Sequence, residues 1–336
     1  MIRVALDAMG GDHAPTNEVK GAVKALAALP ADVIIQLVGQ TQVIEAELAR
    51  QNAPRERIEV IEAPEVVGMA EKPVEAIRGK RKSSIVVGLG LVKAGQSEAF
   101  ISAGNTGAVM AGATLTLKLY PGFERPAIGT PFPTLDDFVL VLDAGANVDC
   151  SAEELVGFAR LGVHYARDVL GRENPAVGLL NIGEESEKGN AAAKEAHRLL
   201  GASGLPFIGN VEGRDLIVGH TDGGHFDVVV CDGFVGNVIL KFYESVAKLF
   251  YQLVEREAGG ETVASPEFRR IWQFLDYARF GGAPLLGVRG VCIICHGKSS
   301  PDAIASAVRV AVEASRHDLV KHMNSAFAPE AGPAAR

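Results

Sequence analysis

Small polar loops that contain glycine follow almost every apolar run of this sequence, and they hold most of the side chains that could do chemistry. Seven loops share this character: residues 7–15, 102–107, 143–147, 181–185, 209–213, 232–237 and 296–300. Glycine lets the backbone turn sharply and approach an anion closely. A helix that begins after such a loop directs free N–H groups toward the same place. One such loop alone is expected only to reverse the chain, but seven that also carry Asp, Asn, His and Lys indicate a functional cleft for a phosphate-containing ligand.

Four basic side chains lie in these loops or just after them, namely His13, Lys188, His296 and Lys298. Such groups can bind phosphate and donate protons. Two acidic residues, Asp7 and Asp143, end apolar runs, and we expect them to order the loops that follow.

Three familiar motifs are matched only in part. Residues 292–296 read Cys-Ile-Ile-Cys-His, the c-type haem pattern, but they fall in a predicted buried strand, where two cysteines three apart point to opposite faces. Residues 297–299 read Gly-Lys-Ser like the end of a Walker A loop, but Cys292 stands where that loop needs glycine. No Gly-x-Gly-x-x-Gly follows the first strand, so ordinary dinucleotide binding lacks support. For the reasons given above, haem binding and a P-loop lack support as well.

The elements that must position these loops alternate between strand and helix. Short β-branched runs predict strands at residues 2–7, 33–38, 58–61, 99–102, 138–143, 176–181, 206–211, 227–231 and 291–296. Amphipathic stretches predict helices at 17–29, 41–51, 84–94, 105–119, 151–170, 188–200, 234–257 and 302–316. Thr41 is the expected N-cap of one helix, and Ser151 with Glu154 forms a capping box at another. The pattern predicts one α/β domain over residues 1–327 with a doubly wound, mostly parallel sheet, whose loops converge at one edge.

One region breaks this alternation. Residues 234–257 and 268–280 are both helical in pattern with no strand between them, and the polar turn 258–260 joins them. We therefore predict a helical hairpin that projects from the sheet, an arm of the kind that commonly builds a dimer interface. Residues 328–336 are predicted to form a disordered tail.

The composition describes a chain with a sizeable core and an acidic balance. Among 336 residues, 48% are hydrophobic and 22% are charged, and the formal net charge is −8. A protein whose main partner is nucleic acid is usually basic, so no nucleic-acid partner is expected. The N-terminus enters an apolar strand at once, and no apolar run approaches the roughly 18 residues of a membrane-spanning helix. The four cysteines do not make a disulfide framework, and we expect a cytoplasmic protein.

Taken together and in order from residue 2 to about 316, the loops resemble those of the bacterial phosphate acyltransferase family, PlsX. The resemblance is carried by Asp-Ala-Met-Gly-Gly-Asp at 7–12 and by motifs at 71–73, 102–108, 124–128, 142–147, 179–185, 188–190, 209–215, 231–237 and 281–287. It implies a homodimer whose fold is similar to that of phosphotransacetylases and of isocitrate and isopropylmalate dehydrogenases.

The resemblance also implies a reaction. A fatty acyl group would pass reversibly from acyl-[acyl-carrier protein] to inorganic phosphate, giving acyl phosphate for phospholipid synthesis. Phosphate is itself the nucleophile, so no Ser-His-Asp or Cys-His arrangement is needed, and no metal or redox cofactor is expected. Positioning phosphate beside the thioester can lower the activation barrier by ~7–11 kcal/mol. Each hydrogen-bond donor to the tetrahedral oxyanion can lower it by roughly 3–4 kcal/mol.

The loops and the resemblance together suggest roles for individual residues. We give Lys188 the central role, in which it offsets charge on phosphate or oxyanion and protonates the leaving thiolate; a surface lysine in a charged loop is the alternative. The remaining catalytic candidates are His13, Asn105 and Asn237. The candidates for binding phosphate or substrate are Gly10, Gly11, Asp12, Gly107, Asn181, Asp232, His296 and Lys298. Helix capping explains Asn105 and Asn237 equally well, and loop hydrogen bonding explains the two histidines equally well.

Acyl carrier proteins are acidic, so docking on an acidic chain needs a local basic patch. The densest one consists of Arg78, Lys80, Arg81 and Lys82. We predict that these four residues dock the carrier protein, although a solvated loop or helix end explains them as well.

The resemblance further implies association with the inner face of the membrane, where a glycerol-3-phosphate acyltransferase would be the partner. The tip of the predicted hairpin, residues 255–266, is polar and acidic and lacks the apolar face of an interfacial helix. Membrane contact is therefore expected through Trp272, Phe274 and Phe280 or through the partner enzyme.

Three other functions are open at this stage. A phosphotransacetylase that uses acyl-coenzyme A would have the same fold. A β-hydroxyacid dehydrogenase would need a nucleotide or metal signature that the sequence lacks. A non-catalytic scaffold that recruits carrier protein to lipid-synthesis enzymes would not need to retain a polar cleft.

Overall fold

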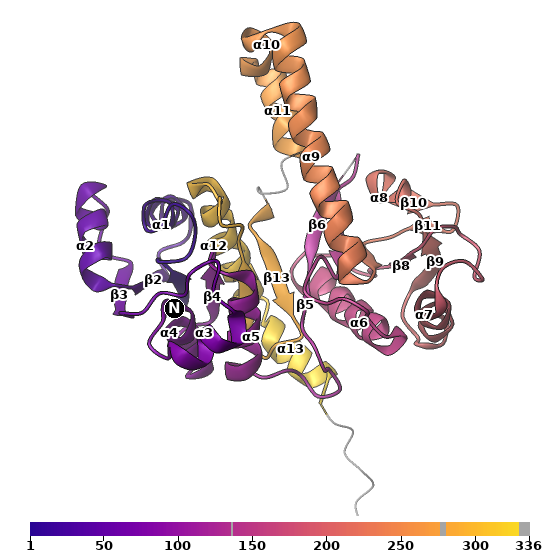
Figure 1. The fold of residues 1–336 in the computed structure, drawn as a ribbon, viewed down its shortest axis with the longest axis horizontal. Helices are drawn as coiled ribbons and strands as arrows, with labels where there is room; N and C mark the ends of the chain where they lie inside the picture. Colours follow the sequence, from indigo (N-terminus) through magenta and orange to yellow (C-terminus); the bar gives the residue numbers. More distant parts are fainter. Residues whose placement is uncertain (136, 276–279, 329–336) are drawn as a thin grey trace, which may run out of the picture. The chain divides into compact units, whose positions relative to one another are not determined.

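The computed structural model describes residues 1–135, 137–275 and 280–328, and it divides into two compact units (Figure 1). Unit 1 consists of Met1–Pro126, Arg167–Gly171 and Gly281–Arg336, and unit 2 of Ala127–Ala166 and Arg172–Phe280. The sequence pattern predicted a single α/β domain, because strand–helix alternation runs through the boundary near residue 126 without a break. All of the predicted tail except Ala328 lies outside the described residues.

The sheet of unit 1 carries its loops on adjacent parallel strands. Its strand order is β3-β2-β1-β4-β14-β13, and all neighbours are parallel except β13 and β14. The strands are β1 (Ile2–Asp7), β2 (Val33–Gly39), β3 (Ile58–Glu62), β4 (Ala99–Ser102), β13 (Ala283–Leu286) and β14 (Val291–Ile294). Side chains on both faces of β1 and β4 are buried, as expected for a parallel sheet that helices cover on both sides.

The helices of unit 1 are α1 (Thr16–Ala28), α2 (Thr41–Arg50), α3 (Pro73–Gly79), α4 (Ser84–Lys93), α5 (Thr106–Thr116), α12 (Pro301–Arg316) and α13 (Leu319–Ala326). Helices α1 and α12 pack together on one face of the sheet, and α3, α4 and α5 form a second group (Figure 1). Glycine permits this packing, because a Cβ at Gly21 would lie 2.6 Å from Ile304 and one at Gly88 would lie 2.4 Å from Phe100.

Unit 2 has a second sheet in the order β6-β7-β12-β8-β9. Its strands are β6 (Thr130–Pro133), β7 (Phe138–Leu142), β8 (Val177–Leu180), β9 (Phe207–Val211) and β12 (Val228–Val230), and only β6 runs antiparallel to its neighbour. Short elements complete the unit: β5 (Ala127–Ile128), β10 (His220–Thr221), β11 (Gly224–His225) and α8 (Asp215–Val218). The longer helices that follow its strands are α6 (Ala152–Asp168), α7 (Ala191–Ala202) and α9 (Gly233–Ala258).

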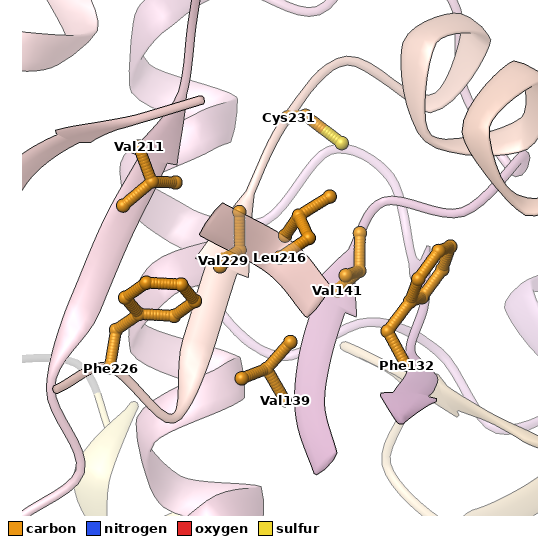
Figure 2. Close-up of a cluster of buried hydrophobic side chains, with 8 residues drawn as sticks. All are labelled: Phe132, Val139, Val141, Val211, Leu216, Phe226, Val229 and Cys231. Atoms are coloured by element: carbon orange, nitrogen blue, oxygen red, sulfur yellow. The ribbon is translucent and has the colours of Figure 1, made fainter. Parts of the chain in front are cut away.

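One face of the unit 2 sheet is closed by a cluster of buried side chains (Figure 2). The cluster draws on four strands, on α8 and on the residues that follow β11 and β12. It consists of Phe132, Val139, Val141, Val211, Leu216, Phe226, Val229 and Cys231. Partly buried residues of α9, among them Tyr243, pack against it. The base of α9 is thereby fixed to the sheet, which in turn fixes the loop that precedes the helix.

The predicted helical hairpin is present in unit 2 (Figure 1). Helix α9 leads through α10 (Gly260–Ala264) into α11 (Pro266–Leu275), and Tyr251 of α9 lies in ring contact with Phe268 and Trp272 of α11. The expected turn is therefore a short helix, entered through Gly259 at φ 83°. Residues 276–279 of the predicted second helix lie outside the described part of the chain, as does the side chain of Phe274.

The predicted fold class, a doubly wound and mostly parallel α/β structure with a helical hairpin, is confirmed. The capping box is also confirmed, because Ser151 N–H donates to the Glu154 carboxylate at 2.8 Å and Glu154 N–H to the Ser151 hydroxyl at 3.2 Å. The N-cap assigned to Thr41 is wrong: α2 begins at Thr41 itself, whose N–H donates to Glu62 at 3.1 Å. Over the described residues, no helix is both long enough and apolar enough to cross a membrane.

Candidate functional site

Three of the predicted loops meet at the carboxyl ends of β1, β4 and β14 in unit 1. These strands are parallel neighbours, and α1, α5 and α12 begin just after the loops. Asp12 N–H donates to the Gly297 carbonyl at 2.7 Å, and a Cβ at Gly10 would lie 2.7 Å from Gly104 N. Only glycine fits at position 10, because any side chain would collide with the loop that follows β4.

Beneath these loops lies a buried pair, Asp7 and Ser102, at the ends of β1 and β4. The Ser102 hydroxyl donates to Asp7 at 2.7 Å and accepts from Gly104 N–H at 3.0 Å, and Asp7 also accepts from Met9 N–H at 3.0 Å. Burial raises the pKa of Asp7, and the hydrogen bond from Ser102 opposes that shift. Asp7 therefore orders the loops, as the sequence predicted.

Glu18, which is not among the residues predicted for the site, is a second buried carboxyl group in unit 1. It lies in the first turn of α1, is only 2% exposed, and its Oε1 is 2.8 Å from where a Cβ at Gly11 would stand. Its Oε2 has no hydrogen-bond partner among the described residues. Burial raises the pKa of Glu18 to about 8, and the charge on Asp7 adds to the effect, so the group is mainly protonated at neutral pH.

The basic candidates of unit 1 are accessible. His13, His296 and Lys298 are exposed, as is Asp12. The His296 Nδ1 accepts the backbone N–H of Lys298 at 3.1 Å, so a neutral ring carries its proton on Nε2 and can donate it. Loop hydrogen bonding and ligand contact are therefore compatible for this histidine, because they use different ring nitrogens.

Asn105 has its side chain fully occupied by the protein. Its Oδ1 caps α5 by accepting Ala108 N–H at 3.0 Å, and its Nδ2 lies within 3.3 Å of the carbonyls of Gly68, Met69 and Glu71. The capping explanation thus describes this residue in the structure. Gly107, the second residue of α5, is needed for packing, since a Cβ there would lie 2.6 Å from Pro73.

The four basic residues at the end of α3 and in the turn before α4 differ in their contacts. The Lys80 ammonium donates to the Val66 carbonyl at 2.8 Å and pairs with Glu71 at 2.5 Å, so it holds the segment in place. Arg78, Arg81 and Lys82 are exposed. These three side chains are the ones available to a partner.

In unit 2 a buried aspartate again organises the loop after a central strand. Asp143 follows β7 and is fully buried. It accepts N–H groups from Ile128, Ala146 and Asn147 at 2.7–3.1 Å, and the Asn147 amide at 2.9 Å. Burial raises the pKa of Asp143, against these hydrogen bonds. Its position under the loop is that of an ordering residue.

The start of α9 fits closely onto this loop. A Cβ at Gly233 would lie 2.2 Å from the Asn147 carbonyl oxygen, and one at Gly236 would lie 2.0 Å from that of Asp143. Asp232 caps the helix by accepting Phe234 N–H at 2.8 Å, and it also accepts Cys150 N–H at 2.8 Å. Asn237 is exposed one turn further along and lies against Gly145, so it does not cap the helix.

Lys188 lies in the loop between β8 and α7, not at a helix start, because α7 begins at Ala191 with Asn190 as its cap. The Asn181 amide donates to the Lys188 carbonyl at 3.1 Å, and Gly189 has φ 90°. The Lys188 side chain is half exposed, and its nearest anion, Glu185, is 4.0 Å away. The loop thus presents an accessible cation on a fixed backbone.

The four cysteines are free and buried, as expected for a chain without a disulfide framework. Burial raises the pKa of Cys292 and of Cys295 to about 12, so both thiols behave as small core residues. No group of three or more His, Cys, Asp or Glu side chains arranged to hold a metal ion occurs in the described residues.

Two signals in the sequence would have found the buried groups. Ser102 ends β4 where Asp7 ends β1, and parallel neighbours bring such residues together. Glu18 shares a helix face with Ala22 and Ala25 at spacings of four and seven residues, and a carboxyl group on an apolar face is a candidate for burial.

Comparison with known proteins identifies a family and relatives over nearly the whole chain. A family model described as "Fatty acid synthesis protein" matches residues 2–322. The curated phosphate acyltransferase of Nostoc punctiforme is 47% identical, covering 97% of this chain and 96% of its own length. That of Heliobacterium modesticaldum is 46% identical, covering 95% and 96%.

Solved structures give the same fold at low identity. A phosphotransacetylase from Streptococcus pyogenes aligns with a TM-score of 0.63 at 16% identity, covering 94% of each chain. The EutD phosphotransacetylase from Staphylococcus aureus aligns with a TM-score of 0.60 at 15% identity, also covering 94% of each. The predicted similarity of fold to phosphotransacetylases is confirmed. Since the family model and relatives of this identity extend over nearly the whole chain, the chain belongs to the phosphate acyltransferase family of acyltransferase enzymes.

Proposed function

We propose that this enzyme transfers a fatty acyl group from acyl-[acyl-carrier protein] to inorganic phosphate and releases acyl phosphate and free carrier protein. The acyl phosphate would then supply phospholipid synthesis. Acyl transfer to phosphate is what the names of the relatives describe; the carrier-bound donor and the product are our proposal.

The observation that carries the proposal is the convergence of three glycine loops and three helix starts at one edge of unit 1. Free N–H groups at helix N-termini favour a phosphate oxyanion, and the loops that precede these helices pack closely because Gly10 and Gly11 have no side chain. His13, His296 and Lys298 are exposed in these same loops. We therefore assign phosphate binding to this edge, with Asp12 and Gly107 as further members.

The chemistry requires no protein nucleophile. A phosphate oxygen attacks the thioester carbonyl carbon, and the carbonyl π electrons move to oxygen to form a tetrahedral oxyanion. Collapse of this intermediate breaks the carbon–sulfur bond, and the thiolate leaves with that electron pair and takes up a proton. The protein must therefore hold phosphate, offset the oxyanion charge and supply the proton.

Within unit 2 we assign the charge-offsetting role to Lys188, whose ammonium group is half exposed and 4.0 Å from Glu185. Asn181 supports it by fixing the Lys188 carbonyl. Asp232 orders the start of α9, and Asn237 is exposed one turn later and is the remaining candidate donor. We assign Asn105 a positioning role, because its side-chain amide is already hydrogen-bonded to the backbone of Met69 and Ala108.

Docking of the acidic carrier protein is assigned to Arg78, Arg81 and Lys82, with Lys80 fixing their segment.

A palmitoyl donor should be tested both on carrier protein and on coenzyme A at equal concentration, with acyl phosphate as the readout. Faster turnover of the carrier thioester supports the proposal, and a preference for coenzyme A would favour the phosphotransacetylase alternative.

We further propose a homodimer built on the hairpin. Helix α9 exposes apolar side chains at helical spacing, including Val238, Phe242 and Leu249, which is typical of an interface between subunits. Sedimentation velocity tests the dimer.

For the membrane we propose contact through a glycerol-3-phosphate acyltransferase, since Trp272 and Phe280 pack inside unit 2 against Tyr251 and Phe138. Flotation with liposomes, with and without that partner, tests this.

A further inference from the structure

A cavity of about 810 Å³ opens in unit 2 at the carboxyl ends of β8 and β12. The start of α7 and the start of α9 both border it. Its lining, which we call the unit 2 cavity, consists of Val148, Asp149, Cys150, Leu155, Leu179, Leu180, Asn190, Ala192, Ala193, Cys231, Asp232, Phe234 and Val235. The volume lies within the range of roughly 300–1,000 Å³ that ligand sites usually have.

The walls of the unit 2 cavity are mainly apolar, and large apolar side chains are also exposed at its rim. Leu155 and Leu179 are 4% and 1% exposed and form buried wall. Val148 and Phe234 are 57% and 64% exposed at the same cavity. Large apolar side chains that are exposed to solvent beside an apolar cavity indicate a surface that a ligand covers.

Two of the three polar members of the lining are already engaged with the backbone, and the third, Asp149, is exposed. Asp232 accepts N–H groups from Phe234 and Cys150 at 2.8 Å each, and Asn190 accepts Ala193 N–H at 2.8 Å. Burial raises the pKa of the Cys150 thiol to about 12 and that of Cys231 still further, so both remain neutral and act as small apolar groups. The cavity therefore offers apolar contact and few polar groups for a hydrophilic ligand.

The position of the cavity relates it to the loop that carries Lys188. Asn190 lines the cavity two residues after Lys188, and the backbone between them is fixed by Gly189 at φ 90° and by the Asn181 amide. The cavity thus adjoins, through the backbone at Asn190, the loop that presents the accessible Lys188 cation.

We propose that the unit 2 cavity binds the alkyl chain of the acyl donor, with the thioester end toward the loop 181–190. This inference rests on the proposed function and adds to it a site that determines acyl-chain length. A long alkyl chain fits because burying it would also cover the exposed rim, Val148 and Phe234, which gains apolar contact on both sides.

The test is to fill the cavity from the surface of α7. Ala192 lines it and Ala191, its neighbour in the first helical turn, does not. Ala192→Phe should lower the ratio of kcat/KM for palmitoyl-carrier over butyryl-carrier protein at least ~10-fold, because pockets discriminate by about that factor per methylene they can no longer hold. The matched variant Ala191→Phe should leave the ratio within about 2-fold. An equal ratio in both variants would overturn the inference while leaving the proposed function intact.

A second measurement separates the cavity from the reaction. Binding of cis-parinaric acid, whose fluorescence rises in apolar surroundings, should be seen with the wild type and Ala191→Phe and should weaken about 10-fold or more in Ala192→Phe. Absence of wild-type binding, or equal binding by all three proteins, would overturn the inference. Binding without any phosphate-dependent turnover would instead contradict the proposed function and support the cavity.

Discussion

Glu18→Gln should flatten the pH dependence of stability. The carboxyl is buried with one oxygen unpartnered, and its pKa is raised from 4.5 to about 8. A group whose folded pKa is raised contributes stability that is fully present below pH 4.5 and is lost as pH rises toward 8, since the unfolded chain releases the proton first. Between pH 5 and pH 7 the loss from this one group is ~2.5 kcal/mol, at about 1.4 kcal/mol per pKa unit.

The assay is urea unfolding at pH 5, 6 and 7, followed by circular dichroism at 222 nm. Glutamine does not titrate, so its variant lacks this ~2.5 kcal/mol fall; a buried amide without partners costs about 1–3 kcal/mol, but equally at each pH. The control is Glu153→Gln, an exposed carboxyl in the first turn of α6. Asp7 and Asp143 titrate in the same sense, so the comparison is between variants. Wild type and Glu18→Gln falling in parallel would refute the reasoning.

Three further perturbations have defined outcomes. Gly236→Ala places a Cβ 2.0 Å from the Asp143 carbonyl oxygen and should cost about 3 kcal/mol of unfolding free energy, whereas Gly201→Ala on α7 meets nothing within 4 Å and should not destabilise. Lys188→Ala should lower kcat at least ~100-fold if the lysine offsets the oxyanion, with the exposed Lys194→Ala as control; turnover within a few-fold of wild type would rule out the assignment. Reversing Arg81 and Lys82 to Glu should raise KM for acyl-carrier protein with kcat unchanged and with a salt-dependent effect, and unchanged KM at low salt would count against carrier docking there.

The sequence predicts the parallel strands of both sheets closely because their signal is local, whereas the antiparallel strand β6 is not predicted. β1 and β4 have the predicted bounds, since β-branched runs end at polar loops. The short pieces were missed: α3 has seven residues and β13 pairs antiparallel at Ala283 and Pro284. Neither is long enough for a periodic pattern, and tertiary contacts decide them.

The site was predictable to the level of loops and not of side chains. The glycine pattern predicted the convergence of loops in unit 1, because loops that pack this closely need residues without a side chain, as at Gly10 and Gly11. The asparagine at 105 has the same residue type whether it caps a helix or binds an anion, and only three-dimensional contacts separate the two. The unit 2 cavity brings together residues from α6, β8, α7 and α9, a juxtaposition that no single stretch of sequence records.

The central claim is that inorganic phosphate is the acyl acceptor and a carrier-bound fatty acyl thioester the donor. The direct measurement is mass spectrometry of the products from palmitoyl-carrier protein, with and without phosphate. Palmitoyl phosphate and free carrier protein should appear in equal amounts and only when phosphate is present. Loss of the thioester without phosphate, or formation of free palmitate alone, would contradict the account.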